Sequence, residues 1–267
     1  MVDETVEKGI AMAKFCVILP AAGNSSRFGG KKTETHLKKP FVHLNDQAVW
    51  LYAAQKFLDR KDVGQLIVVL SKSDEDFFQM KFKANMAVMG FKVVYGGDER
   101  VDSVRNALQE IDADCDYVAI HDAARPCLQD SWIDGVFAQA QRNGAAILAS
   151  PIVGTIKKVD TQTNRITETV SRTGLWQAQT PQVFEKNLLL KAYAQYQGHA
   201  TDDSQVVEAA GHSVDIVPCP HTNIKITTQE DLKLAAGILR SAPKKNILAD
   251  MSSPAPKKPT HLDDLFG

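Results

Sequence analysis

Apolar runs of strand length alternate with helical stretches over residues 15–150, and this alternation constrains the fold more than any other feature. We expect strands at Phe15–Leu19, Gln65–Leu70, Phe91–Tyr95, Tyr117–Ile120 and Ala145–Ser150. We expect helices at Ala48–Leu58, Ser103–Ile111 and Trp132–Arg142. Such alternation predicts an α/β protein with a mainly parallel sheet covered on both faces. Ligands of such sheets bind at the carboxyl ends of the strands.

Two further segments depart from this alternation. Residues 152–174 alternate apolar and polar residues around the turn-forming stretch 160–164, which predicts a protruding β-hairpin. A hairpin with so little core usually packs on something else, such as a second subunit. Residues 241–267 are rich in Pro, Lys and Ser and predict a disordered tail. This divides the chain into an N-terminal extension (1–14), one folded domain (15–240) and the tail. We expect the end of the tail to be free in solvent. The less favoured alternative is that Leu262, Leu265 and Phe266 bind weakly to another protein.

Charge and cysteine usage limit the partners. The 267 residues carry a net charge of −1, so no general basic field favours nucleic acid or an anionic membrane. No apolar stretch approaches the roughly 18–20 residues that span a bilayer. The four cysteines are scattered without C-x-x-C spacing, which argues against a zinc site or a disulfide framework. We therefore expect a cytoplasmic protein with reduced thiols.

A small-residue loop follows the first strand. Residues 20–30 read PAAGNSSRFGG, and lysines follow at 31, 32, 38 and 39. Small residues let a nucleotide lie close to the backbone, and the cations suit a polyphosphate. The loop is neither a Walker A nor a Rossmann motif, because the required spacings are absent. An ordinary turn without a ligand explains this loop, taken alone, about equally well.

Two more motifs follow strands. In 96–103, GGDERVDS, the glycines allow a planar base to approach the backbone; the alternative is a turn in which Ser103 caps the next helix. In 121–126, HDAARP, Asp122 could hold a divalent ion beside phosphates and Arg125 could pair with a phosphate. The alternative is an Asp–Arg pair that stabilises the loop. We interpret His121 as a structural histidine rather than a general base.

Taken together, the motifs resemble one family. PAAGxxxRFG, GGxERxxSV, VxIHDAARP, TVxRxxLWxxQTPQ, TDD and NIKIT occur in this order between residues 20 and 227. The pattern is similar to that of the 2-C-methyl-D-erythritol 4-phosphate cytidylyltransferases of the non-mevalonate isoprenoid pathway, over about residues 15–239. The resemblance implies a Rossmann-like nucleotidyltransferase fold, CTP and methylerythritol phosphate as substrates, Mg²⁺, and a homodimer joined by the hairpin as a β-arm. The expected products are 4-diphosphocytidyl-2-C-methyl-D-erythritol and pyrophosphate.

The resemblance also implies roles for individual residues. Three cations match catalytic positions: Arg27, Lys39 and Lys225. The nucleotide would contact Ala21, Ala22, Gly23, Gly97, Asp98, Arg100, Ser103 and Ala123. The acceptor would contact Asp122, Arg125, Thr155, Arg172 and Thr201. Asp122 would also bind the metal. Thr155 and Arg172 lie on the β-arm and would reach the active site of the partner subunit.

The chain departs from the family pattern at three places, and two other functions stay open. The segment between Arg27 and Lys39 is long, so Lys31 and Lys38 are rivals of Lys39. Pro40 stands where the family usually has Gln, and Gly154 stands where an Asp often precedes the arm threonine. A cytidylyltransferase for a pentitol phosphate, such as ribitol 5-phosphate, would share the fold and the mechanism. A non-catalytic nucleotide-binding protein is disfavoured, because a binder needs fewer cations.

Overall fold

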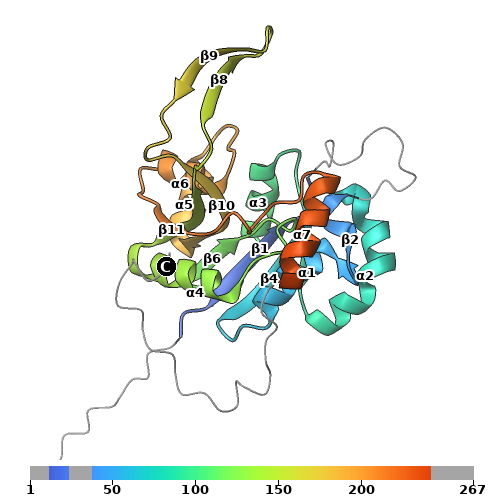
Figure 1. Cartoon of the computed structure of the whole chain (residues 1–267). Helices are drawn as coiled ribbons and strands as arrows, with labels where there is room; N and C mark the ends of the chain where they lie inside the picture. Colours follow the sequence, from blue (N-terminus) through green and yellow to red (C-terminus); the bar gives the residue numbers. More distant parts are fainter. Residues whose placement is uncertain (1–11, 24–37, 242–267) are drawn as a thin grey trace, which may run out of the picture.

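Seven strands form the central sheet, in the order β11-β7-β10-β6-β1-β4-β5. The computed structural model of the chain describes residues 12–23 and 38–241, and Figure 1 shows these strands between helices. The strands are β1 (Phe15–Pro20), β4 (Val63–Leu70), β5 (Lys92–Tyr95), β6 (Tyr117–Ile120), β7 (Ala145–Pro151), β10 (Trp176–Glu185) and β11 (Asp215–Pro218). Only β10 runs antiparallel to its neighbours, β6 and β7. The expected mainly parallel α/β sheet is therefore confirmed.

Helices cover both faces of the sheet. One face packs against α1 (Val49–Leu58), α2 (Glu75–Met89) and α4 (Asp130–Asn143). The other packs against α3 (Arg100–Leu108), α5 (Lys186–Gln195) and α6 (Asp203–Ala209), while α7 (Gln229–Ser241) packs near α1. Alternate residues of β1 enter the two layers, with Val17 and Leu19 on one side and Cys16 and Ile18 on the other.

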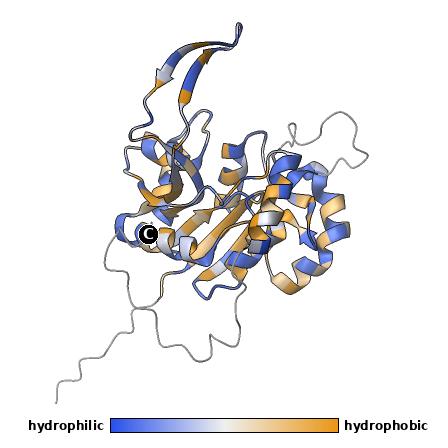
Figure 2. Ribbon diagram, in the orientation of Figure 1, coloured by the Kyte–Doolittle hydropathy of each residue, from blue (hydrophilic) through white to orange (hydrophobic). Residues whose placement is uncertain are grey.

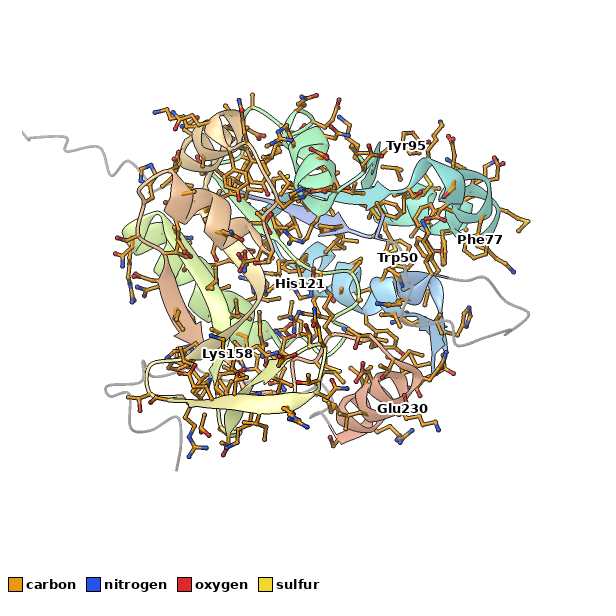
Figure 3. The ribbon with its side chains drawn as sticks, turned by 90° about the horizontal axis from the view of Figure 1, so that it is seen from above. Trp50, Phe77, Tyr95, His121, Lys158 and Glu230 are labelled. Carbon is orange, nitrogen blue, oxygen red and sulfur yellow. The ribbon has the colours of Figure 1, made fainter. Side chains whose placement is uncertain are left out.

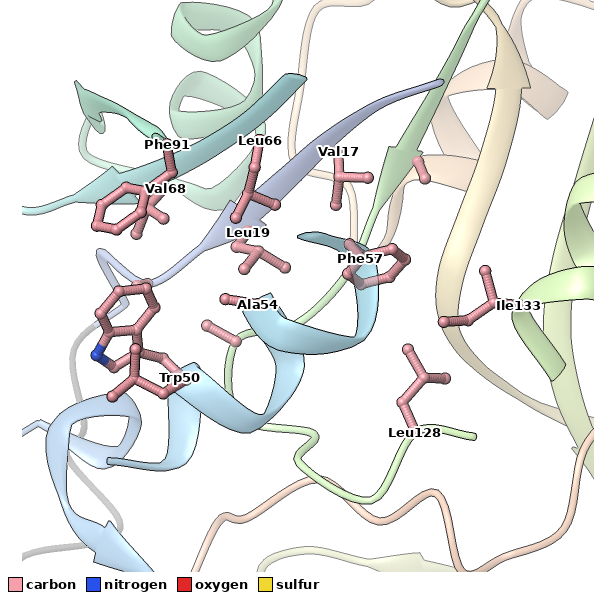
Figure 4. Close-up of a cluster of buried hydrophobic side chains, with 14 of the residues drawn as sticks. Val17, Leu19, Trp50, Ala54, Phe57, Leu66, Val68, Phe91, Leu128 and Ile133 are labelled. Carbon is pink, nitrogen blue, oxygen red and sulfur yellow. The ribbon is translucent and has the colours of Figure 1, made fainter. Parts of the chain in front are cut away.

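The first layer holds the larger aromatic residues. Trp50 is fully buried, and its ring lies 5.3 Å from the rings of Phe78, Phe82 and Phe91. Figure 4 shows Trp50 and Phe91 beside Val68 and Leu19 at one end of this layer, with Phe57 and Ile133 at the other. The apolar strands lie inside the molecule and polar residues lie outside, as the hydropathy colours of Figure 2 show. This packing fixes the positions of the strands, whose carboxyl ends form the candidate site described below.

The hairpin predicted for 152–174 is present. Strands β8 (Ile156–Asp160) and β9 (Arg165–Val170) pair antiparallel and extend away from the sheet (Figure 1). The turn is closed by Asp160, whose side chain accepts hydrogen bonds from the backbone N–H groups of Gln162 and Thr163. Val153, Val159 and Ile166 are exposed on this hairpin or at its base.

Several predicted boundaries need correction. Helix α3 begins at Arg100 after Glu99, so Ser103 lies inside the helix and does not cap it. The short elements η1 (Lys39–Phe41), β2 (His43–Leu44) and β3 (Gln47–Ala48), and the regular structure after residue 175, were not predicted. A turn and the start of a helix are expected over residues 71–75, where η2 (Lys72–Asp74) leads into α2. Residues 1–11, 24–37 and 242–267 lie outside the described residues, and so do Arg27, Lys31 and the apolar residues of the predicted tail. Within the described ranges, no helix is long and apolar enough to cross a membrane.

Candidate active site

A cavity of about 920 Å³ lies at the carboxyl ends of β1, β4, β5 and β6. Most of the site residues named from the sequence line it: Ala21, Ala22, Gly23, Lys39, Gly97, Asp98, Arg100, Ser103, Asp122, Arg125 and Lys225. The three predicted loops therefore meet in one place, because the parallel strands β1, β5 and β6 end at the same edge of the sheet.

The loop after β1 and the loop after β5 approach each other closely. The backbone N–H of Ala21 donates to the Val69 carbonyl at 2.8 Å, and that of Gly96 donates to the Leu70 carbonyl at 2.8 Å. A Cβ atom on Gly96 would lie 2.9 Å from the Ala22 Cβ, and one on Gly97 would lie 2.5 Å from the Asp102 Cβ. Only glycine fits at these two positions, and this lets the loop after β5 pack closely on Ala22 and on α3 to form one wall of the cavity.

An ion pair fixes Arg100 in the cavity wall. Its Nη2 donates to Oδ2 of the fully buried Asp203 at 2.6 Å, and the Tyr193 hydroxyl donates to Oδ1 of the same carboxylate at 2.5 Å. Burial lowers the pKa of Arg100, but the Asp203 charge raises it by more, and the net shift is upward. Arg100 is therefore a permanent cation with a fixed position.

A second cluster of charged side chains surrounds Asp122, at the end of β6. The Lys225 Nζ lies 2.9 Å from Asp122 Oδ2, and the Arg125 Nε lies 3.3 Å from the same oxygen. Burial raises the pKa of Asp122, but the charges of Lys225, Arg100 and Arg125 lower it by more, well below its ordinary value. The cluster therefore holds an ionised carboxylate among three cations.

His121 is a structural residue, as the sequence suggested. It is fully buried near the centre of the molecule (Figure 3). Its Nε2 lies 3.1 Å from the Arg125 carbonyl, which can only accept, so Nε2 carries the proton. Its Nδ1 lies 3.1 Å from the Thr180 hydroxyl, which itself accepts from the Asp122 backbone N–H. Burial lowers the pKa of His121 to about 4, so the neutral ring holds the Asp122–Arg125 loop.

This pKa gives a testable pH dependence. The unfolded chain binds a proton at His121 below about pH 6.5, whereas the folded chain does so only near pH 4. The stability that depends on neutral His121 is therefore complete above pH 6.5 and is lost as the pH falls toward 4. We expect this group to lower the free energy of unfolding by up to about 3 kcal/mol over that window.

Urea unfolding of the wild type and of His121→Gln at pH 7 and pH 4.5 measures the difference. The gap in stability between the two proteins should narrow at the lower pH. A second readout needs no substitution: the His121 ring should show no NMR titration above pH 5. Titration of the ring near pH 6.5 would contradict the assignment.

Lys38 and Lys39 have different surroundings. The Lys38 Nζ lies 2.7 Å from Asp74 Oδ2, and Lys38 is not among the residues that line the cavity. Lys39 lines the cavity at the start of the 3₁₀ turn η1. The structure therefore supports Lys39 over Lys38, while Lys31 lies outside the described residues.

Some residues named from the sequence do not line the cavity within this chain. Ala123 is fully buried beside Asp122 and outside the lining. The Thr201 hydroxyl donates to Gln205, outside the lining. Thr155 and Arg172 lie at the exposed base of the hairpin, where the Arg172 guanidinium donates to the Val153 carbonyl. A role for Thr155 and Arg172 in catalysis requires a second subunit.

The cavity also contains residues that the sequence reasoning did not assign, namely Ser71, Lys72, Gln177, Gln179, His221, Asn223 and Thr227. Gln177 and Gln179 belong to the LWQAQTPQ segment, and Asn223 and Thr227 belong to NIKIT. The motif matches contained the signal for Gln179, Asn223 and Thr227, whereas Gln177 stands at an unspecified position of its motif. Ser71, Lys72 and His221 carried no comparable signal.

Comparison with known proteins gives a consistent result. The family model described as 2-C-methyl-D-erythritol 4-phosphate cytidylyltransferase matches residues 15–241. Proteins of that name from Rhodopirellula baltica and Clostridioides difficile are 39% and 37% identical to this chain; the matches cover 85% and 84% of it, and 95% and 93% of those proteins. The solved structure of the enzyme so named from Thermus thermophilus superposes with a TM-score of 0.70 at 27% identity, covering 85% of this chain and 99% of that one.

Proposed function

The chain belongs to the 2-C-methyl-D-erythritol 4-phosphate cytidylyltransferase family, and on that premise we propose how its residues divide the work of the reaction. It is a nucleotidyltransferase that transfers the cytidylyl group of CTP to 2-C-methyl-D-erythritol 4-phosphate in the synthesis of isoprenoid precursors. The products are 4-diphosphocytidyl-2-C-methyl-D-erythritol and pyrophosphate. The matched region spans nearly all of the relatives, so this activity concerns the whole domain.

One observation carries the assignment of roles: Lys39, Arg100, Arg125 and Lys225 line the cavity, and the charges of the last three keep the Asp122 carboxyl ionised. The reaction joins two anions, because a phosphate oxygen of the acceptor attacks the α-phosphorus of CTP and pyrophosphate leaves. The main obstacles are charge repulsion, alignment and the charge that develops in the transition state. A set of fixed cations addresses all three.

No strong general base is needed. A phosphate monoester has a second pKa of about 6 and is therefore largely dianionic and nucleophilic near neutral pH. His121, whose pKa is lowered to about 4 and whose ring nitrogens are both occupied, is assigned no proton transfer. Arg27 and Lys39 are assigned to the triphosphate, and Arg125 and Lys225 to the phosphate of the acceptor.

Asp122 is the residue we assign to Mg²⁺. Magnesium is usually held by one or two carboxylates together with phosphate oxygens and water. Asp122 fits this chemistry because it stays ionised, and because both of its cation contacts engage Oδ2. The Asp122 carboxylate would therefore hold the metal. When bound, the ion neutralises phosphate charge and orients the triphosphate.

We also propose a cytoplasmic homodimer joined by the hairpin. The exposed apolar residues Val159, Ile166, Leu175 and Trp176 on and near it are unusual for a free surface and suit burial by a second subunit. All four cysteines are unpaired, which suits a reducing compartment. In the dimer, Thr155 and Arg172 of one subunit would serve the site of its partner.

A substrate panel tests the function. Pyrophosphate release should be measured with CTP, UTP or ATP against methylerythritol phosphate or ribitol 5-phosphate. We expect turnover with CTP and methylerythritol phosphate, and at least about tenfold less with UTP, because an unpaired polar group at the cytosine site costs roughly 1–3 kcal/mol. Asp98, Ser103 and the Gly97 backbone are the groups assigned to the cytosine edge.

The other outcomes are informative. Faster turnover with ribitol 5-phosphate would show that the acceptor is a pentitol phosphate. The names of the relatives favour methylerythritol phosphate. Equal turnover with CTP and UTP would show that Asp98 and Ser103 do not distinguish cytosine from uracil. Nucleotide binding without any turnover would mean a non-catalytic binding protein.

A further inference from the structure

Three buried polar atoms in the wall of the cavity have no hydrogen-bond partner. Among the described residues, the unpaired buried side-chain atoms include Arg100 Nη1, Gln179 Oε1 and Asn223 Oδ1, and all three residues line this cavity. A buried polar group without a partner costs about 1–3 kcal/mol. Their concentration in one cavity indicates that a ligand completes them.

The orientation of the Asn223 side chain is fixed by its neighbours. Its Nδ2 donates to the Thr180 carbonyl at 3.0 Å, and a carbonyl can only accept, so the other amide atom is the oxygen. Its backbone carbonyl accepts from Arg125 Nη1 at 2.6 Å. Asn223 is fully buried, and its Oδ1 is an acceptor without a partner in a residue whose backbone binds Arg125.

Gln179 lies on the same wall. Its Nε2 donates to the Ser150 hydroxyl at 3.1 Å, and its own backbone carbonyl accepts from Gln182 Nε2 at 3.4 Å. The residue is 3% exposed. Gln179 directly precedes Thr180 on β10, and the Thr180 carbonyl accepts from Asn223 on the loop before Lys225, so the two residues belong to the same part of the cavity wall.

The chemistry of these atoms selects the ligand group. Carbonyl oxygens accept hydrogen bonds, and phosphate oxygens also accept, so a phosphate cannot satisfy Gln179 and Asn223. A hydroxyl group can. The unpaired Nη1 of Arg100, in contrast, can donate a hydrogen bond to a phosphate oxygen.

The location then selects the molecule. The Asn223 backbone binds Arg125, and Thr180, the neighbour of Gln179, accepts from the Asp122 backbone N–H, whereas the glycine wall assigned to the base lies with Ala22 and Ser103. We infer that the side-chain carbonyl oxygens of Gln179 and Asn223 bind hydroxyl groups of the polyol chain of the acceptor and so determine its specificity. This inference rests on the proposed function, because it places the polyol beside the cations assigned to the acceptor phosphate.

The main test replaces Gln179 with methionine, which keeps the length of the side chain and removes both its oxygen and the Nε2 that donates to Ser150. We expect the KM for methylerythritol phosphate to rise about 10-fold or more, with the KM for CTP unchanged, because one buried hydrogen bond is lost. Asn223→Ala should act in the same direction. Gln195→Met, at an exposed position at the end of α5, controls for the substitution itself and should match the wild type.

Acceptor analogues that each lack one hydroxyl separate binding from a structural role. The wild type should lose about 10-fold or more in kcat/KM with the analogue that lacks the bound hydroxyl, whereas Gln179→Met should lose nothing further with that analogue. Additive losses with every analogue, or a lower melting temperature with an unchanged acceptor KM, would overturn the inference. So would a rise in the KM for CTP alone. Failure of the wild type to use methylerythritol phosphate at all would instead reject the proposed function, and that is seen before any variant is made.

Discussion

Replacement of Lys39 by alanine is expected to lower kcat about 10²- to 10³-fold with a much smaller change in the KM for CTP. The reason is that a fixed cation stabilises the charge of the transition state more than that of bound CTP, and loss of one such group costs about this factor. Steady-state kinetics with CTP and methylerythritol phosphate at saturating Mg²⁺ measure it. Arg27→Ala should behave in the same way if Arg27 also contacts the triphosphate.

Lys38→Ala is the matched control for Lys39. The two lysines are adjacent, but Lys38 forms an ion pair with Asp74 and Lys39 lines the cavity. Lys38→Ala should therefore lose little activity and at most a small part of its stability. A silent Lys39→Ala together with an inactive Lys38→Ala would show that the catalytic cation has been placed one residue too late in the chain.

One inactive variant in the hairpin and one in the cavity are expected to recover activity when their subunits are mixed in one dimer. Arg172→Ala removes the hairpin guanidinium, and Lys225→Ala removes a cation that lines the cavity. If Arg172 acts in the site of the partner, a mixed dimer contains one site with both residues intact. Random pairing makes half of the dimers mixed, each with one good site of two, so activity should recover to about a quarter of the wild-type value.

The experiment consists of co-refolding the two variants, confirming dimers by sedimentation, and measuring turnover. Each variant refolded alone is the control and should stay inactive. The alternative is that Arg172 is a solvated charge on the hairpin, and such charges contribute little. Dimers that form without any recovery would place Arg172 in its own subunit's site or outside the chemistry.

Local patterns predicted the parts of the fold that depend on local physics. The run Phe15–Pro20 is buried on both faces, and such a strand is apolar throughout, so it was recognisable. The turn at Asp160 was recognisable because an aspartate side chain binds backbone N–H groups two and three residues ahead. The strand β10 was missed because its sequence includes Gln177, Gln179 and Gln182, and it is a strand only because β6 and β7 pair with it.

The sequence by itself determined the sheet, the loops at its carboxyl edge and the identity of the charged groups, since periodicity and motif order are local properties of the chain. Only the tertiary structure decided which of these groups meet. The Asp122–Lys225 pair joins residues 103 positions apart, and the Arg100–Asp203 pair joins residues equally far apart. It also separated Lys38 from Lys39, placed Ser103 inside a helix, and left the oxygens of Gln179 and Asn223 without partners. Each of these outcomes depends on burial and on contacts between distant segments, which no window of the sequence contains.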